Sequence, residues 1–143
     1  MRIAIGSDHA GFLVKEEIVK FLKQEGYEVE DVGTQSKDSC DYPIFGRKVG
    51  ELVASKNCEF GIVICSSGEG IMMAANKVKG IRCGIAYNDQ TAELLRQHND
   101  ANVISFGANF MAIDDIKRRL KIFLNTDFLG ERHLRRVNLI EEK

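Results

Sequence analysis

A cysteine followed by small residues is the feature of this sequence with the clearest chemical potential. The segment Cys65-Ser66-Ser67-Gly68-Glu69-Gly70 leaves an apolar run and enters a predicted helix. Small residues let the backbone approach a ligand closely, and the free amides of a helix N-terminus attract an anion. The same partial positive charge favours the thiolate form of a cysteine. The segment therefore predicts a basic thiolate beside amides that stabilise a developing oxyanion. A buried structural cysteine that ends a core strand is the alternative.

Two familiar kinds of loop are excluded by the residues that follow this segment. A phosphate-binding P-loop needs Lys and then Ser or Thr after its last glycine, whereas Gly70 is followed by Ile71 and Met72. A cysteine phosphatase loop places an arginine six residues after its nucleophile, and that position is again Ile71. The segment therefore lacks the cation that either class uses to bind phosphate.

Two further pairs of residues carry side chains suited to sugar phosphates. Asp8 and His9 follow the first apolar run, where they can contact hydroxyls and anions, with helix capping by Asp8 as the alternative. His98 and Asn99 close a predicted helix, where His98 suits proton transfer near neutral pH and ordinary C-capping is the alternative. A receiver domain would also use an aspartate on this fold, but it wants a lysine after the fifth strand, where this chain has Gly107-Ala108-Asn109.

The C-terminal segment 130–136 concentrates cations. Arg132, His133 and Arg136 lie at helical spacing and can converge on one phosphate, although such a run is usually a solvated helix face. Over the whole chain, Lys and Arg total 20 and Asp and Glu total 21, for a formal net charge of −1. This balance gives no general attraction to nucleic acid or to an anionic membrane, so an anion site has to be local.

The cysteines and histidines form no metal or disulfide pattern. None of the four cysteines belongs to a C-x-x-C pair, and none of the three histidines has zinc-finger spacing to a cysteine. We therefore expect no metal, and four free thiols fit a reducing compartment. No apolar run approaches the roughly 20 residues of a transmembrane helix, and the N-terminus lacks a signal-peptide pattern. The sequence thus predicts a cytoplasmic protein with no membrane partner.

The elements that must position these groups alternate between strand and helix. Nearly continuous apolar runs predict five buried parallel strands over Arg2–Ser7, Tyr27–Val32, Phe60–Cys65, Arg82–Tyr87 and Asn102–Phe106. Apolar stripes at helical spacing fill the gaps, with Pro43 at the start of the second helix and Asp41 nearby as a cap. This alternation predicts one α/β domain over residues 1–143. Its form is a Rossmann-like three-layer sandwich with right-handed crossovers, strand order 2-1-3-4-5 and a C-terminal helical tail.

This topology gives an independent reason to expect a site at Cys65. In the predicted order the chain reverses direction between the first and third strands, and ligands bind at the carboxyl ends of the strands beside such a switch point. The two loops that flank it carry Asp8 with His9 and Cys65 with its small neighbours. The loops richest in reactive groups therefore coincide with the expected ligand crevice.

Together these motifs resemble the type B ribose-5-phosphate isomerases, within the sugar-phosphate isomerases that include galactose-6-phosphate isomerase. The matching segments run from Gly6 to Arg136 and read GSDHAGF, DVGT, DYP, CSSGEGI with AANKV, GIR, RQHNDANV, FG and ERHLRR. The resemblance implies interconversion of ribose 5-phosphate and ribulose 5-phosphate through a cis-enediolate, with no cofactor. It also implies a homodimer, or a dimer of dimers, with active sites at the subunit interface.

The resemblance further implies roles for single residues. Cys65 would be the base that moves a proton between C2 and C1, and Ser67 with the loop amides would stabilise the enediolate oxygen. His98 would help to open the furanose ring, with Asp8 contacting the ring atoms. The positions that match phosphate-binding ones are His9, Arg132 and Arg136. The other positions expected to bind the substrate are Tyr42, Ser66, Gly68, Glu69, Gly70, Asn99 and Asn109.

Three positions depart from the family pattern. Ser66 stands where many members have glycine, and Asn109 stands where many place a phosphate-binding arginine. Glu69 adds a carboxylate that would disfavour the Cys65 thiolate if it faced inward. Another branch uses a glutamate base two residues further on, where this chain has Ile71. Two alternatives stay open: an isomerase of a six-carbon sugar phosphate, such as allose or galactose 6-phosphate, and a non-catalytic sugar-phosphate-binding module.

Overall fold

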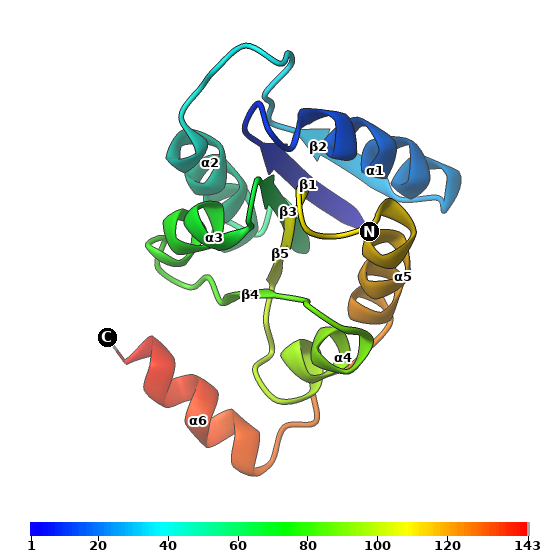
Figure 1. Cartoon of the computed structure of the whole chain (residues 1–143). Helices are drawn as coiled ribbons and strands as arrows, with labels where there is room; N and C mark the ends of the chain where they lie inside the picture. Colours follow the sequence, from blue (N-terminus) through cyan, green and yellow to red (C-terminus); the bar gives the residue numbers. More distant parts are fainter. Residues whose placement is uncertain (143) are drawn as a thin grey trace.

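Alternating apolar runs and helical stripes fold the chain into a five-stranded parallel sheet between two layers of helices (Figure 1). The structure is a computed structural model and describes residues 1–142. The strands are β1 (Arg2–Ser7), β2 (Glu28–Asp31), β3 (Phe60–Cys65), β4 (Cys83–Ile85) and β5 (Val103–Gly107). The helices are α1 (Phe12–Gln24), α2 (Tyr42–Ala54), α3 (Glu69–Asn76), α4 (Asp89–Gln97), α5 (Ile113–Leu124) and α6 (Arg132–Glu141). The predicted three-layer α/β class and the helical tail are confirmed.

Two apolar cores, one on each face of the sheet, hold the layers together. On one face, strand residues such as Ile5 and Phe106 pack against α1, α4 and α5. On the other face, residues such as Ala4 and Val63 pack against α2 and α3. Cys65 belongs to this second core and is 5% exposed. The expected site cysteine therefore faces the α2–α3 layer.

The strand order is 2-1-3-5-4, so the predicted order 2-1-3-4-5 is wrong at one edge. The reason is the position of α4, which packs on the same face as α1. A right-handed crossover on that face moves the chain in the direction of the β1-to-β2 connection, which from β4 leads back toward β3. The wholly buried β5 therefore pairs with both β3 and β4, and the short β4 becomes the outer strand.

This order brings three loops together at the carboxyl edge of the sheet. β3 lies between β1 and β5, and the loops that leave these two neighbours lead to α1 and α5 on the face opposite α3. Ligand crevices form where adjacent loops diverge in this way. The predicted switch point between β1 and β3 is retained. Asn109, which follows β5, now lies beside the Cys65 loop instead of one strand further away.

A side chain closes the outer edge of β4. The Asn76 amide donates from Nδ2 to the Cys83 carbonyl at 2.9 Å and accepts the Cys83 N–H at Oδ1 at 2.7 Å. An unpaired strand edge invites pairing with another chain. Asn76 occupies the backbone groups of Cys83 that would take part, so the sheet ends at β4.

Candidate active site

The Cys65 loop is a tight strand-to-helix turn with a donor aimed at the sulfur. Cys65 ends β3 and Glu69 begins α3, while Gly68 between them adopts a φ of +84°, which side chains other than glycine rarely tolerate. In this turn the Gly68 N–H donates to Cys65 Sγ at 3.2 Å. A hydrogen bond of this kind favours the charged form of its acceptor. The turn therefore places a backbone donor against the sulfur at the carboxyl end of β3.

Ser67 and Glu69 form the outer side of the same turn. The Glu69 N–H donates to Ser67 Oγ at 3.1 Å, which leaves the hydroxyl proton available to a ligand. Both side chains are exposed. They line a cavity of about 550 Å³ together with Met72, Ile85, Tyr87, Phe110 and Met111. A polar rim and an apolar wall thus adjoin the turn.

The segment after β5 forms hydrogen bonds to the other side of the turn. The Ala108 N–H donates to the Cys65 carbonyl at 2.9 Å, and the Asn109 N–H donates to the Ser66 carbonyl at 3.0 Å. Asn109 Nδ2 also donates to Ser66 Oγ at 2.7 Å. Two of the positions that depart from the family pattern therefore contact each other.

Asp8 and His9 lie on the β1 side of the turn. The Asp8 N–H donates to the Ile64 carbonyl at 3.3 Å, and Asp8 Oδ1 accepts the Gly11 N–H at 3.1 Å. Asp8 thus also makes a local contact with the backbone just before α1. His9 Nδ1 accepts the Cys40 N–H at 3.2 Å. The proton of the neutral His9 ring is then carried on Nε2, which can donate to an anion.

Tyr42 reaches this edge from the start of α2. Its ring lies against the backbone of Gly70, where a Cβ atom would be 2.6 Å from Tyr42 Cζ. Only a glycine at position 70 allows this contact without displacement of the ring. The residues that the structure brings together here, which we call the Cys65 edge, are Asp8, His9, Tyr42, Cys65, Ser66, Ser67, Gly68, Glu69, Gly70 and Asn109.

The other predicted residues lie at the opposite edge of the sheet, which we call the His98 edge (His98, Asn99, Arg132 and Arg136). His98 is the C-cap of α4, and its N–H donates to the Leu94 carbonyl at 2.9 Å. Because α4 ends just before β5 begins, this turn lies at the amino ends of the strands (Figure 1). At roughly 3.3 Å per residue, β5 separates the two edges by about 15 Å. One chain therefore does not bring His98 to its own Cys65.

His133 on α6 stacks on His98. The two ring centroids are 4.1 Å apart and the rings are inclined by 12°. Burial lowers the pKa of His133 below its ordinary value, and the charges of His98, Arg132 and Arg136 act in the same direction. His133 is therefore neutral near pH 7. The helical spacing of Arg132, His133 and Arg136 predicted that they converge on one phosphate, but the structure turns His133 inward while both arginines stay exposed.

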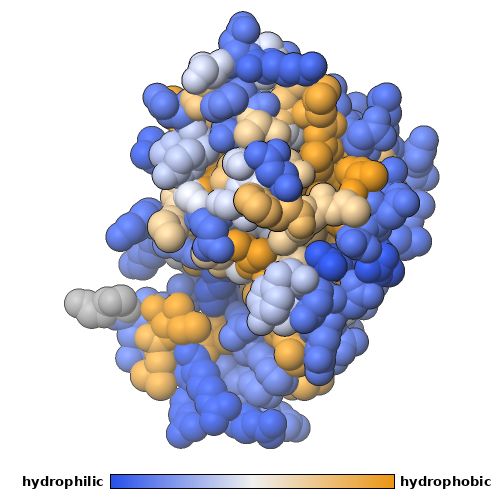
Figure 2. Space-filling view, in the orientation of Figure 1, coloured by the Kyte–Doolittle hydropathy of each residue, from blue (hydrophilic) through white to orange (hydrophobic). Residues whose placement is uncertain are grey.

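Both edges also present apolar surface. α6 projects from the helical layers (Figure 1), and Leu139 and Ile140 near its end are 59% and 55% exposed. Figure 2 shows this apolar patch over the C-terminal half of α6. At the Cys65 edge, Tyr87 and Phe110 are 67% and 77% exposed. Exposed apolar groups gathered in this way are typical of interaction surfaces.

Residues 1–142 offer neither a metal-binding cluster nor a membrane-spanning helix. Within them, no group of three or more His, Cys, Asp or Glu side chains is placed to hold a metal ion. Across the same part of the chain, no helix combines the length and apolar character that crossing a membrane requires. All four cysteines are free thiols.

Known proteins resemble this chain over nearly its whole length. A family model described as Ribose/Galactose Isomerase matches residues 3–140. Ribose-5-phosphate isomerase B of Escherichia coli (strain K12) is 42% identical over 139 residues, which cover 97% of this chain and 93% of that protein. The solved structure of Clostridium thermocellum ribose-5-phosphate isomerase B has a TM-score of 0.98 at 48% identity and covers 99% of this chain and 96% of its own. The Mycoplasma genitalium ribose-5-phosphate isomerase B with bound ribulose 5-phosphate has a TM-score of 0.95 at 36% identity, with coverage of 99% and 94%.

Proposed function

Because the chain belongs to the ribose/galactose isomerase family, we propose that it is an aldose–ketose isomerase that interconverts ribose 5-phosphate and ribulose 5-phosphate. The observation that carries this proposal is the Gly68 N–H on the Cys65 sulfur in a strand-to-helix turn. The relatives named ribose-5-phosphate isomerase B support the choice of substrate. So does the Mycoplasma genitalium structure, which holds ribulose 5-phosphate on the same fold.

The proposed reaction moves one proton between adjacent carbons. The Cys65 thiolate removes the proton from C2 of the open-chain aldose, the released electron pair forms the C1–C2 double bond, and the C1 carbonyl oxygen becomes anionic. The Ser67 hydroxyl and the amides of the turn stabilise this oxygen. The thiol then returns the proton to C1, while the proton of the C2 hydroxyl passes to the C1 oxygen. The result is a ketose with the same atoms and charge.

A second copy of the chain completes the site in this proposal. The His98 edge carries the cations that suit a phosphate and the imidazole that suits ring opening, yet it lies about 15 Å from the Cys65 edge of the same chain. A homodimer that apposes the two edges puts His98 against the sugar ring and places Arg132 and Arg136 against the phosphate. The exposed apolar residues at both edges support such an interface.

A six-carbon sugar phosphate is the second candidate substrate. The cavity of about 550 Å³ beside Ser67 favours it, since this space can hold a longer sugar chain. The test is a comparison of kcat/KM for ribose 5-phosphate, allose 6-phosphate and galactose 6-phosphate under one set of conditions. We expect ribose 5-phosphate to be preferred by at least about 10-fold, the size of effect that one misplaced group produces. The reverse ranking would support the six-carbon alternative, and saturable binding without turnover would support a binding module.

Gly107 provides a further prediction, because the geometry of the turn depends on its lack of a side chain. Gly107 lies opposite Cys65 on β5, and a Cβ atom there would collide with the backbone carbonyl of Ser67, 2.7 Å from its carbon atom. We expect Gly107→Ala to displace the turn and to lower kcat/KM for ribose 5-phosphate by about 10²-fold, the cost of misplacing reacting groups by about 1 Å.

The matched control is Gly84→Ala on β4. The nearest atoms to a Cβ at Gly84 belong to the flexible side chain of Leu95, at a position outside the Cys65 turn. We expect this variant to keep kcat/KM within a few-fold of the wild type. Equal losses in the two variants would show that the turn has no special part in the reaction.

A further inference from the structure

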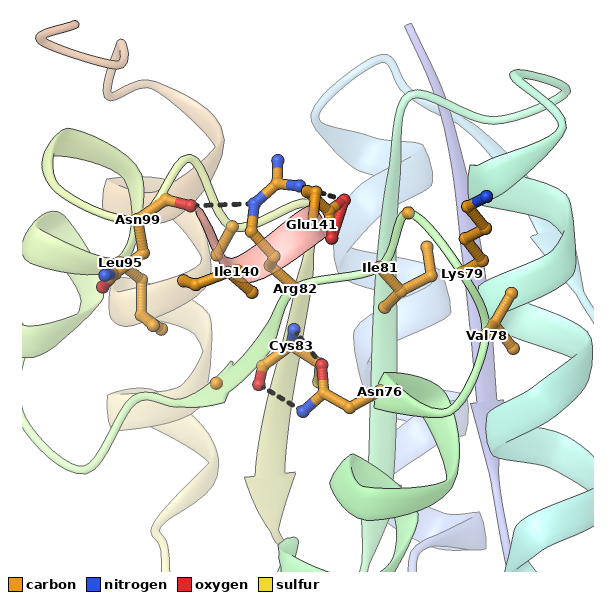
Figure 3. A pocket seen from close by; sticks show the side chains of 13 residues that line it. Asn76, Val78, Lys79, Ile81, Arg82, Cys83, Leu95, Asn99, Ile140 and Glu141 are labelled. Atoms are coloured by element: carbon orange, nitrogen blue, oxygen red, sulfur yellow. Dashed lines mark hydrogen bonds and ion pairs between the residues drawn. The ribbon is translucent and has the colours of Figure 1, made fainter. Parts of the chain in front are cut away.

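Arg82 is a largely buried cation that belongs to neither group of predicted site residues. It lies just before β4, and its side chain is 15% exposed. With Leu95, Asn99, Ile140 and others it lines a cavity of about 510 Å³ between β4, the end of α4 and α6 (Figure 3). None of the proposed catalytic or substrate-binding residues lies in the GIR motif that contains Arg82.

The guanidinium of Arg82 joins two segments that are far apart in the sequence. Nε donates to the Asn99 carbonyl at 3.0 Å, and Nη2 donates to the Asp100 carbonyl at 2.7 Å. Nη1 donates to Glu141 Oε2 at 3.0 Å. Figure 3 shows the group between Asn99 and Glu141. A planar fork of donors can make these contacts at once, whereas the single ammonium of a lysine cannot.

The turn after α4 needs this restraint. Asp100 has a φ of +46°, in the left-handed region that residues other than glycine rarely adopt. Arg96 holds the turn from the other side, since its Nη1 donates to Asp100 Oδ1 and to the Ala101 carbonyl, each at 2.8 Å. Loss of Arg82 would leave the carbonyls of Asn99 and Asp100 without these donors. The His98 turn could then relax.

The position of α6 depends on the same residue. The His98–His133 stack holds the start of the helix, and the Arg82–Glu141 ion pair holds its end. Arg132 and Arg136, on the first turns of α6, are exposed. Both contacts that bracket α6 therefore lead back to the turn that carries His98.

We propose that Arg82 is a positioning residue for the isomerisation, which fixes the His98 turn and α6 in one arrangement so that ring opening and phosphate binding act together. This inference rests on the proposed function. Arg82 does not itself bind the substrate phosphate, because each of its three nitrogens already donates to a protein group and its charge is matched by Glu141 and Asp100. It acts through the residues that it holds.

The first test compares the kinetics of three variants with those of the wild type on ribose 5-phosphate. Glu141→Gln weakens only the tie to α6, so we expect KM to rise about 5-fold with kcat within about 2-fold. Arg82→Met releases both segments, so KM rises and kcat falls by about 10-fold or more. Arg82→Lys keeps the charge opposite Glu141 but loses the fork, so it recovers KM more than kcat.

Arg118→Met is the matched control for loss of an arginine with ion pairs. Arg118 is half exposed and bonds to Asp89 and Asp115, outside the His98 turn and α6. We expect its kcat and KM to match those of the wild type. If the wild type is active and Arg82→Met has the same kinetics, the inference about Arg82 is overturned while the proposed function stands. An inactive wild type would overturn the proposed function instead.

A second test separates positioning from a general loss of folding. Arg82→Met is co-expressed with Cys65→Ser, so that hybrid dimers contain one site built from the intact Cys65 edge of the first chain and the intact His98 edge of the second. We expect activity above that of either variant alone. A hybrid without this recovery would overturn the inference, because it would show that Arg82→Met damages the Cys65 edge as well.

Discussion

Replacing Cys65 by alanine is expected to lower kcat for ribose 5-phosphate by at least about 10³-fold while the fold is retained, since a positioned general base contributes about 10²–10⁴-fold. Alanine offers no group that can take the C2 proton, and the Gly68 N–H that contacts Sγ would lose its acceptor. The change removes one sulfur atom at the rim of the α2–α3 core, so the expected loss of stability is about 1–2 kcal/mol. Steady-state kinetics and thermal unfolding measure the two effects separately.

Cys58→Ala is the control for removal of a buried thiol. Cys58 is 1% exposed, and burial raises the pKa of its thiol, so it is neutral and unsuited to act as a base. We expect this variant to lose a similar amount of stability and to keep near wild-type kcat. Substantial turnover in Cys65→Ala would exclude Cys65 as the base. A loss of similar size in Cys58→Ala would point to packing as the cause.

Two inactive variants are expected to restore activity when their chains are combined. Cys65→Ser disables the Cys65 edge, and the double variant Arg132→Ala/Arg136→Ala disables the His98 edge. If each site uses one edge from each copy, a hybrid dimer has one intact site and one doubly defective site. Random pairing of equal amounts makes half of the dimers hybrids, so activity should reach about one quarter of the wild-type value.

The control for this experiment combines two variants of the same edge. Cys65→Ser with Gly107→Ala leaves a defective Cys65 edge in both sites of every hybrid, so no recovery is expected. Hybrid dimers are isolated with two different affinity tags, which confirms that the chains have paired. Isolated hybrids of the first pair without activity would contradict a shared site, and so would equal recovery in the control.

The parallel sheet was predictable from the sequence, whereas the order of its last two strands, β5 and β4, was not. Runs such as Phe60–Cys65 are continuous in apolar residues because the strand is covered on both faces. The position of β5 depends on which face of the sheet α4 covers, and that is decided by packing against α5 and not by the residues of α4 alone. In the structure, Val103–Gly107 is completely buried, whereas β4 is a short strand of three residues. These two features identify β5 as the inner strand.

The turn that carries Cys65 was predictable because its geometry is local. Cys65, Gly68 and Glu69 form one strand-to-helix turn, as the small residues between an apolar run and a helical stripe indicate. The Ser66–Asn109 contact was not predictable, because it exists only with β5 beside β3. The separation of the two edges and the stack of His98 on His133 likewise arise from tertiary packing.

The most direct test of the proposed isomerisation is the initial rate at which the purified protein of residues 1–143, dialysed against EDTA, converts ribose 5-phosphate to ribulose 5-phosphate. Proton transfer by a cysteine at an amide-rich turn requires no metal ion or cofactor, so the chelator should have no effect. We predict turnover at about 1–10³ s⁻¹, the usual range for enzymes. A folded protein that forms no ketose under these conditions would contradict the account.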